Sequence, residues 1–214
     1  MNYEPNPDKR VGASRPTSAF ARIERMPPLL VALYLAMGAS CVLFLVLVAA
    51  YVSTRAHSDL PSGLYPFPRY FSLSTVVLLL SSYTVGQASR LYAQDDLTNL
   101  GRCLGATLLL GCVFAGLQLL GWRELGIQGM LFRGKASGTF VYLITGVHVA
   151  HLAAGLLAAL VLLVRVLHAE RDAVRTLVFI RNPYHRRQLR AITTYWHFVD
   201  VLWVVLFAVF LFLY

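Results

Sequence analysis

Charged residues are scarce in this chain. They make up 14% of its 214 residues, whereas a soluble domain carries roughly 25%. Hydrophobic residues make up 57%, and the mean hydropathy is +0.62. This scarcity excludes an ordinary soluble domain and favours a protein embedded in a lipid bilayer.

Motifs for a metal or a cofactor are also lacking. The three cysteines, Cys41, Cys103 and Cys112, show no CxxC and no Cys/His spacing typical of a metal site. The sequence contains no P-loop and no HExxH motif. We therefore expect no catalytic residue, no metal and no cofactor in this chain.

The first 28 residues differ from the rest. They are polar, carry several arginines, and lack the short apolar core with a small-residue cleavage site that marks a signal peptide. We expect residues 1–28 to form a cytoplasmic N-terminal tail and residues 29–214 to form a membrane domain.

Five apolar segments follow, each near the 20 or so residues that a transmembrane helix needs. The second is rich in Ser and Thr, which favours packing against other helices. In the fourth, small residues recur every four positions from Gly146 to Ala158, a pattern that allows close helix approach. We predict an all-α fold, an integral membrane bundle of five transmembrane helices. The segments are about residues 29–52, 70–90, 100–120, 138–164 and 192–214.

Positive charge gathers in the connections between these segments. The formal net charge is +9, and the tail and loops carry fourteen Lys and Arg on the side of the N-terminus against five on the other side. The positive-inside rule then places the N-terminus in the cytoplasm and the C-terminus outside. Because membrane topology accounts for this charge, we expect no nucleic-acid partner.

A few ionisable residues lie inside the predicted helices, where such groups are costly and are candidates for function. His197 and Asp200 are three residues apart, so they share a helix face and are placed to form a hydrogen bond. His148 and His151 share a face of the fourth segment in the same way. Interhelical anchoring fits both pairs, and a proton relay at Asp200 is an alternative.

Haem ligation by His148 is a second alternative, which would make the chain a membrane b-type cytochrome. Two axial histidines must reach one iron at similar depth. At 1.5 Å per residue, His148 lies roughly 15 Å below one surface and His197 roughly 8 Å below the other, in a core about 30 Å thick. This mismatch disfavours a shared haem. The small number of intramembrane ionisable residues likewise disfavours a transporter.

Two stretches resemble a known family, subunit III of the haem-copper terminal oxidases. Residues 195–203 read YWHFVDVLW, similar to the family pattern YWHFVDVVW. Residues 145–151 read TGVHVAH and are followed by Gly155, similar to TGFHGLHV…G. The likeness covers about residues 29–214 and is to the five-helix form. The family positions in this chain are His148, His151, Tyr195, Trp196, His197, Asp200, Trp203 and Gln118.

The resemblance implies a non-catalytic subunit of a proton-pumping cytochrome c or quinol oxidase, in the respiratory chain of a bacterial cytoplasmic membrane. In that family haem and copper lie in the catalytic subunit I. Subunit III packs against it and binds phospholipid between its helices, and the motif residues would fix the bundle and its lipids without doing chemistry. Three arginines suit lipid phosphates, with plain positive-inside topology as the alternative. They are Arg186, Arg187 and Arg190.

The chain departs from the family at two positions. The family usually carries carboxylates where this chain has Ser40 and Gly121. We therefore expect a divergent subtype in which any proton-handling or lipid-contacting role of those carboxylates is missing. A subunit-III-like partner of nitric oxide reductase is the alternative that these departures leave open.

Overall fold

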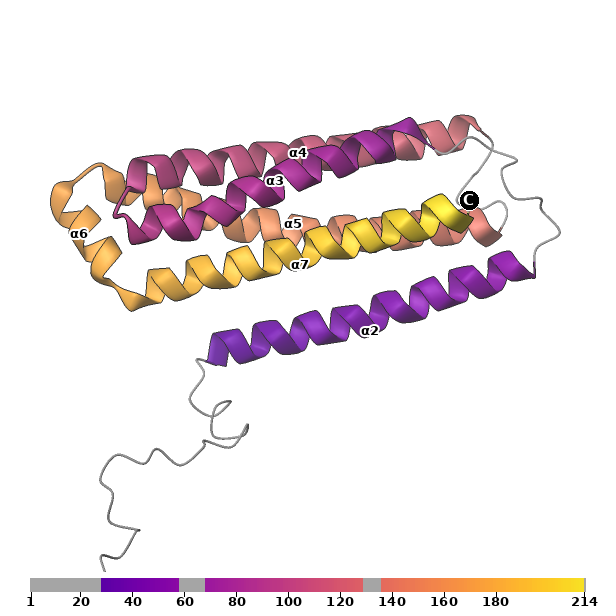
Figure 1. The fold of residues 1–214 in the computed structure, drawn as a ribbon, viewed down its shortest axis with the longest axis horizontal. Coiled ribbons are helices and arrows are strands. Elements are labelled where there is room, and N and C mark those ends of the chain that lie inside the picture. Colours follow the sequence, from indigo (N-terminus) through magenta and orange to yellow (C-terminus); the bar gives the residue numbers. More distant parts are fainter. Residues whose placement is uncertain (1–27, 58–67, 129–135, 214) are drawn as a thin grey trace, which may run out of the picture.

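The computed structural model describes residues 28–57, 68–128 and 136–213, which form six helices and no strand (Figure 1). Five helices are long and apolar enough to cross a membrane, which confirms the predicted all-α, five-span fold. Apart from Pro28, the expected tail lies outside the described residues. The helices are α2 (Pro28–Ala56), α3 (Arg69–Ala93), α4 (Leu97–Ile127), α5 (Ala136–Glu170), α6 (Ala173–Arg181) and α7 (Pro183–Leu213).

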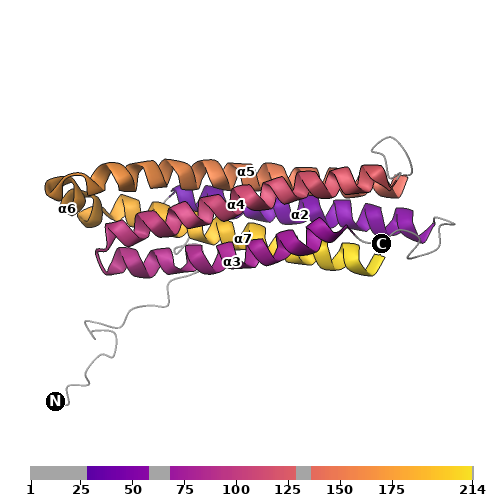
Figure 2. The same ribbon diagram turned by 90° about the horizontal axis from the view of Figure 1, so that it is seen from above.

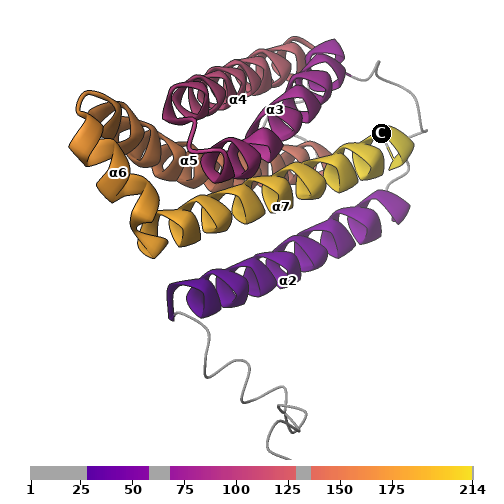
Figure 3. The same ribbon diagram turned by 60° about the vertical axis from the view of Figure 1, so that its left-hand side comes forward.

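The five long helices run side by side along one axis, and α6 crosses from α5 to α7 at one end (Figures 1 and 2). α3 and α4 form an antiparallel hairpin, and α2 lies on the far side of α7, where it contacts α5 and α7 (Figure 3). The hairpin turn is tight because Asp95 adopts a left-handed φ of 58°, which Asp tolerates better than most residues. α7, which contains the 195–203 motif, contacts α2, α3 and α5.

Local sequence signals set where several helices begin. Pro28 and Pro183 begin α2 and α7, at a position where the missing N–H of proline costs nothing. Asp96 caps α4 by accepting a hydrogen bond from the Asn99 backbone N–H at 3.0 Å. This bond, with a second from the Asn99 side chain, lowers the pKa of the Asp96 carboxyl. Asp172 caps α6 in the same manner.

Several helices are longer than the apolar segments that predict them. α7 begins at Pro183 rather than at 192, α5 continues past 164 to Glu170, and α4 covers residues 97–127 rather than 100–120. Hydropathy detects only the part of a helix that lies in the hydrocarbon core. The helices continue through polar residues beyond it, and α6, with a mixed composition, escapes detection altogether.

The main hydrophobic core lies between the five long helices, with Phe44 and Tyr51 as the buried contribution of α2. Its largest members, Trp196 and Trp203, are 1% and 0% exposed. Phe114 and Phe71 pack edge-on against Trp203, with ring centroids 5.2 and 6.0 Å apart. Both tryptophans belong to α7, so this helix supplies the centre of the bundle.

A second hydrophobic cluster lies at the end of the bundle that α6 closes. Phe179 of α6 packs edge-on against Tyr92, with centroids 6.3 Å apart. The Tyr92 hydroxyl donates a hydrogen bond to the Ile180 carbonyl at 3.0 Å. Val166 and Leu189 complete this cluster from α5 and α7, so α6 is fixed to three long helices.

Close helix contacts occur at single glycines rather than along the whole predicted small-residue stripe of α5. A Cβ on Gly111 would meet Leu156 at 2.8 Å, and a Cβ on Gly155 would meet Tyr195 at 3.2 Å. Ala154 and Ala158 of the stripe instead line an open groove. No helix of the described chain fills the space beside these two alanines, so close helix approach along the second half of the stripe stays a prediction.

Gly121 is closely covered by its neighbour on α3. A Cβ at this position would collide with the Phe71 ring, which in turn packs against Trp203. The space beside Gly121, where the resemblance predicts a carboxylate in the family, is thus filled by an aromatic ring. Gly116, on the same helix, has no atom within 4 Å of the corresponding Cβ position.

These two glycines give a matched test of the packing. We expect Gly121→Ala to lower the stability of the purified protein in detergent by about 1–3 kcal/mol, because overpacking forces Phe71 to move. Gly116→Ala should be neutral or should stabilise by up to about 1 kcal/mol, because Ala favours a helix over Gly. Thermal unfolding of the two variants measures the difference, and equal unfolding temperatures would contradict the packing at Gly121.

Candidate functional site

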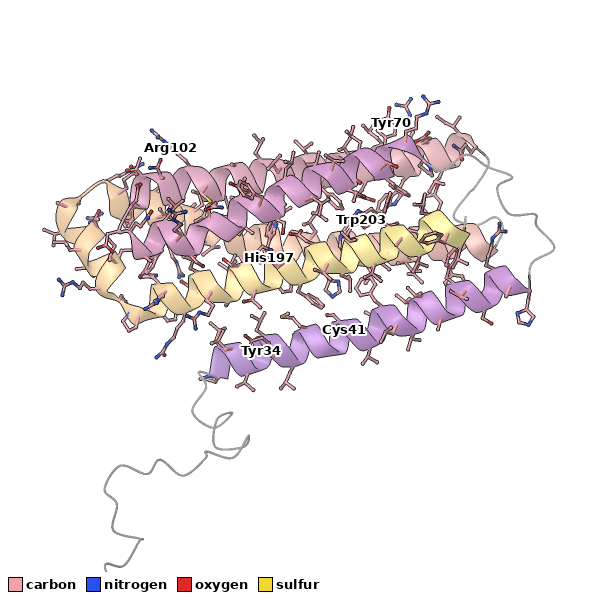
Figure 4. The ribbon with its side chains drawn as sticks, viewed as in Figure 1. Tyr34, Cys41, Tyr70, Arg102, His197 and Trp203 are labelled. Carbon is pink, nitrogen blue, oxygen red and sulfur yellow. The ribbon has the colours of Figure 1, made fainter. Side chains whose placement is uncertain are left out.

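Three side-chain hydrogen bonds join α7 to α3, and each pairs a residue of the 195–203 motif with a hydroxyl group. His197 and Trp203 lie along α7 in Figure 4. The Ser/Thr-rich sequence of the second segment predicts packing against other helices, and these contacts between α3 and α7 confirm it. The bonds are Trp203 Nε1 to Thr75 Oγ1 (3.0 Å), Trp196 Nε1 to Ser81 Oγ (3.0 Å) and His197 Nδ1 with Ser82 Oγ (2.8 Å).

Asp200 lies between these bonds and is 3% exposed. Neither carboxyl oxygen has a hydrogen-bond partner of good geometry within the described chain. The predicted Asp200–His197 hydrogen bond is wrong, because His197 pairs with Ser82 instead. The Ser82 hydroxyl also lies near the Asp200 carboxyl, but its close contact is with the imidazole.

His151 connects three helices. Its Nδ1 donates to the Val147 carbonyl at 2.8 Å, so in the neutral imidazole Nε2 is an acceptor. Nε2 lies 3.0 Å from the Ser40 hydroxyl of α2, and the His151 carbonyl accepts a hydrogen bond from Tyr195 of α7 at 3.0 Å. Ser40, the other position at which the resemblance predicts a family carboxylate, thus makes a polar link between α2 and α5.

His148 is fully buried in an aromatic cage. The ring centroids of Trp203, Phe114 and Phe44 lie 5.0, 5.9 and 6.5 Å from that of His148, and neither ring nitrogen has a hydrogen-bond partner within the described residues. A porphyrin could reach these nitrogens only by displacing the cage, so the site does not fit haem. No cluster of three His, Cys, Asp or Glu in residues 28–57, 68–128 and 136–213 could hold a metal ion.

Gln118 joins α4 to α3. Its Nε2 donates to Ser74 Oγ at 3.0 Å, and both residues are buried. One turn further along, Trp122 Nε1 donates to Thr145 Oγ1 of α5 at 2.9 Å. Most of the family-like polar residues therefore link helices inside the bundle, whereas His148 and Asp200 are buried there without such a bond in the described chain.

A groove of about 520 Å³ opens between α2, α5 and α7. Its walls are apolar, with Gln188 and Tyr195 as the polar exceptions. Gln188 Oε1 accepts a hydrogen bond from Arg165 Nη1 at 2.9 Å, so the groove ends at a guanidinium group. The lining residues are Leu29, Leu33, Ala154, Gly155, Leu157, Ala158, Val161, Gln188, Ala191, Ile192 and Tyr195.

The three arginines predicted to contact lipid are exposed on the first turns of α7. At 100° per residue, Arg187 lies beside the groove-lining face of the helix that contains Gln188. Arg186 and Arg190 project from other sides of α7. The structure thus brings one of the three toward the groove and separates the other two from it.

Sequence reasoning misses Gln188, which lines the groove, and Arg165, which hydrogen-bonds to it. Arg165 follows Ala154, Ala158 and Val161 at helical spacing, and this continuation of the small-residue stripe into a cation is a signal that could have found it. Gln188 carries no such signal, because only the fold brings it opposite α5.

Comparison with known proteins identifies the family. The family model described as Cytochrome c oxidase subunit III matches residues 61–214. The chain is 33% identical over 179 residues to cytochrome c oxidase subunit 3 of Bacillus sp. (strain PS3), across 82% of this chain and 81% of that protein. Identity is 31% over 183 residues to the probable cytochrome c oxidase subunit 3 of Mycobacterium bovis, across 83% and 84% of the two chains.

A quinol oxidase subunit is similar as well. Identity to cytochrome bo(3) ubiquinol oxidase subunit 3 of Pseudomonas aeruginosa is 29% over 179 residues, across 82% of this chain and 80% of that protein. The family model covers α3 to α7, which carry the linked polar residues described above, and the longer alignments reach into α2. With five apolar helices in addition, the chain belongs to the cytochrome c oxidase subunit III family.

Proposed function

We propose that this chain is a non-catalytic subunit that packs on the catalytic subunit of a proton-pumping haem-copper oxidase and holds structural phospholipid. Membership of the family makes it a subunit III of a cytochrome c or quinol terminal oxidase. Haem and copper then belong to the partner, subunit I. The observation that carries the lipid-holding role is the groove between α2, α5 and α7.

The groove has the size and surface that an acyl chain requires. Its volume of about 520 Å³ lies within the range of about 300–1,000 Å³ typical of ligand pockets. Small residues form much of its wall, so the groove is open enough to admit a chain beside the α5 and α7 backbones. Residues of this kind are Ala154, Gly155, Ala158 and Ala191.

The polar end of the groove suits a phosphate group. Arg165 lies at the end of the α5 stripe and is held by Gln188, and Arg187 follows on the adjacent side of α7. Each basic residue near a membrane surface contributes about 1 kcal/mol to the binding of anionic lipid. An acyl chain in the groove would place its headgroup beside these two arginines, whereas Arg186 and Arg190 would meet the surrounding membrane surface.

The interior polar residues have a structural role in this proposal. His151, His197, Trp196 and Trp203 each hydrogen-bond to a residue of another helix. The His151–Ser40 contact links α5 to α2, the Tyr195 hydrogen bond to the His151 carbonyl links α7 to α5, and the other three bonds fix α7 against α3, so together they position the helices that border the groove. His148 and Asp200 fill the centre of the bundle and carry no chemistry of their own.

We further propose that the arginine-rich end of the bundle faces the cytoplasm. All seven Arg between Arg165 and Arg190 lie at the end that α6 closes, and the bacterial relatives support a multi-pass protein of the cytoplasmic membrane. The N-terminus would then be cytoplasmic and the C-terminus outside.

A pull-down tests the assembly. When tagged protein is extracted in mild detergent from its native membrane, we expect a haem-copper catalytic subunit to co-purify, because a subunit III has no redox centre and acts only within the complex. Mass spectrometry of the eluate and a reduced-minus-oxidised spectrum identify that partner. Elution of the chain alone and colourless would overturn the proposal, and recovery with a nitric oxide reductase would replace the partner.

Two alanines of α5 test the lipid role. Ala158 lines the groove, whereas Ala153 is also exposed on the same helix but does not line it. We expect Ala158→Phe to reduce the phospholipid that the purified complex retains after a delipidating wash, because the new ring fills the groove. Ala153→Phe should retain as much lipid as the native protein. Equal lipid content in the two variants, measured by mass spectrometry, would place the lipid elsewhere.

Asp200 tests the separation of structure from redox chemistry. We expect Asp200→Ala to shorten the time for which the complex remains active during turnover, because the carboxyl lies at the α3–α7 contact. The reduced-minus-oxidised haem spectrum of the complex should be unchanged, since this chain holds no haem. Loss of the haem spectrum in a complex that still contains both subunits would contradict the structural role.

A further inference from the structure

α6 presents an apolar stripe on its outer face. Val174, Leu177 and Val178 are 66%, 60% and 63% exposed, and their spacing of three and four residues places them on one side of the helix. Arg181, four residues after Leu177, extends the same side and is also exposed. The outer face of α6 is therefore apolar from Val174 to Val178 and cationic at its C-terminal end, where Arg181 lies.

The stripe cannot turn inward, because the opposite face of α6 is fixed to the bundle. Phe179 is buried against Tyr92, and the Tyr92 hydroxyl donates to the Ile180 carbonyl. Thr176 Oγ1 donates to the Ala169 carbonyl of α5 at 3.0 Å. These contacts hold three inward residues in place and leave the apolar stripe facing away from the protein.

α6 lies at the level of the lipid headgroups. Each of α3, α4, α5 and α7 carries one exposed arginine near this end. Because long basic side chains extend toward the membrane interface, these arginines mark the edge of the hydrocarbon core. These are Arg90, Arg102, Arg165 and Arg190, and Figure 4 shows Arg102 at the α6 end of the bundle. From Arg165, α5 continues five residues to Glu170, or about 8 Å, and a headgroup layer is roughly 5–8 Å thick.

The charge of this surface suits an anionic partner. The nearby acidic side chains are already engaged: Asp172 caps α6 and lies 3.7 Å from Arg175, and Glu170 accepts a hydrogen bond from Thr98 at 2.6 Å. Arg181 makes no hydrogen bond or ion pair with the part of the chain that the structure describes. Its guanidinium group is available to an anion beside the apolar stripe.

We propose that α6 is an interfacial helix that binds the anionic surface of the membrane. Val174, Leu177 and Val178 enter the boundary between headgroups and acyl chains, and Arg181 pairs with a lipid phosphate. An apolar stripe with basic flanks, lying across the bundle axis, is the arrangement by which amphipathic helices bind membrane surfaces. The proposal depends only on the chain being embedded in a membrane, so it stands or falls separately from the α2–α5–α7 groove.

Spin labels at two positions of α6 test this placement in the full-length chain. The native cysteines are first replaced by Cys41→Ala, Cys112→Ala and Cys103→Ser, the last keeping a donor for the Thr84 carbonyl that Cys103 contacts. A nitroxide is then attached at Val178→Cys, on the stripe, or at Ala173→Cys, an exposed position in the first turn of α6 that lies about 140° around the helix from Val178. Each protein is reconstituted into phosphatidylglycerol or phosphatidylcholine vesicles.

The readout is the accessibility of the label to oxygen, which enriches in lipid, relative to a water-soluble nickel complex. We expect a several-fold higher ratio at position 178 than at position 173 in phosphatidylglycerol vesicles. Adding Arg181→Gln should reduce the ratio at 178 in phosphatidylglycerol and leave it unchanged in phosphatidylcholine. Equal ratios at 173 and 178 would overturn the proposal. Exposure of 178 to water in vesicles, with protection from both reagents only in the assembled oxidase, would overturn it in favour of a protein partner.

Discussion

The hydrogen bonds between the α7 tryptophans and the α3 hydroxyls are the constraint on which the rest of the structure depends. An indole N–H buried in hydrocarbon without a partner costs several kcal/mol, and both tryptophans are almost fully buried. Thr75 and Ser81 meet this requirement, and in doing so they fix the rotation and the depth of α7 against α3. Once α7 is placed, Tyr195 can reach α5 and Gln188 can reach Arg165, which together define the groove.

The same constraint explains which parts of the structure follow from the sequence. Each span has to satisfy its own backbone groups in lipid, so a long apolar run can only be a helix, and hydropathy locates all five spans. The polar residues of the 195–203 motif also fall inside the bundle, as their cost in lipid requires. The hydrogen-bond partners of these residues cannot be predicted from the sequence in the same way. The three-residue spacing of His197 and Asp200 predicts that they share a helix face but does not predict a hydrogen bond between them. A hydroxyl on α3 at 2.8 Å proves to be the partner of His197.

The bundle also carries polar groups that the α3–α7 bonds do not satisfy. His148, Asp200 and the Gln118 side-chain oxygen are buried without complete hydrogen bonding in the described chain, and each open group costs about 1–3 kcal/mol. Leu or Phe at these positions would remove that cost. Apolar packing alone would therefore give a more stable bundle without these polar residues. The interhelical hydrogen bonds around them must offset the free energy that their burial costs. The sequence identifies these residues as unusual, but only the structure distinguishes the bonded His151 and His197 from the unbonded His148.

Ser40 and Gly121, the two positions at which the resemblance predicts a family carboxylate, differ in how the fold would accommodate one. Ser40 keeps a polar atom within 3.0 Å of His151, so α2 remains linked to α5 and a longer side chain would point toward an imidazole able to pair with it. At Gly121 the space is taken by Phe71, whose ring also packs on Trp203. A carboxylate there would have to displace Phe71 and, through it, disturb the tryptophan that bonds to Thr75. A carboxylate at position 40 would therefore exchange one polar group for another, whereas one at position 121 would disturb the packing of α3, α4 and α7.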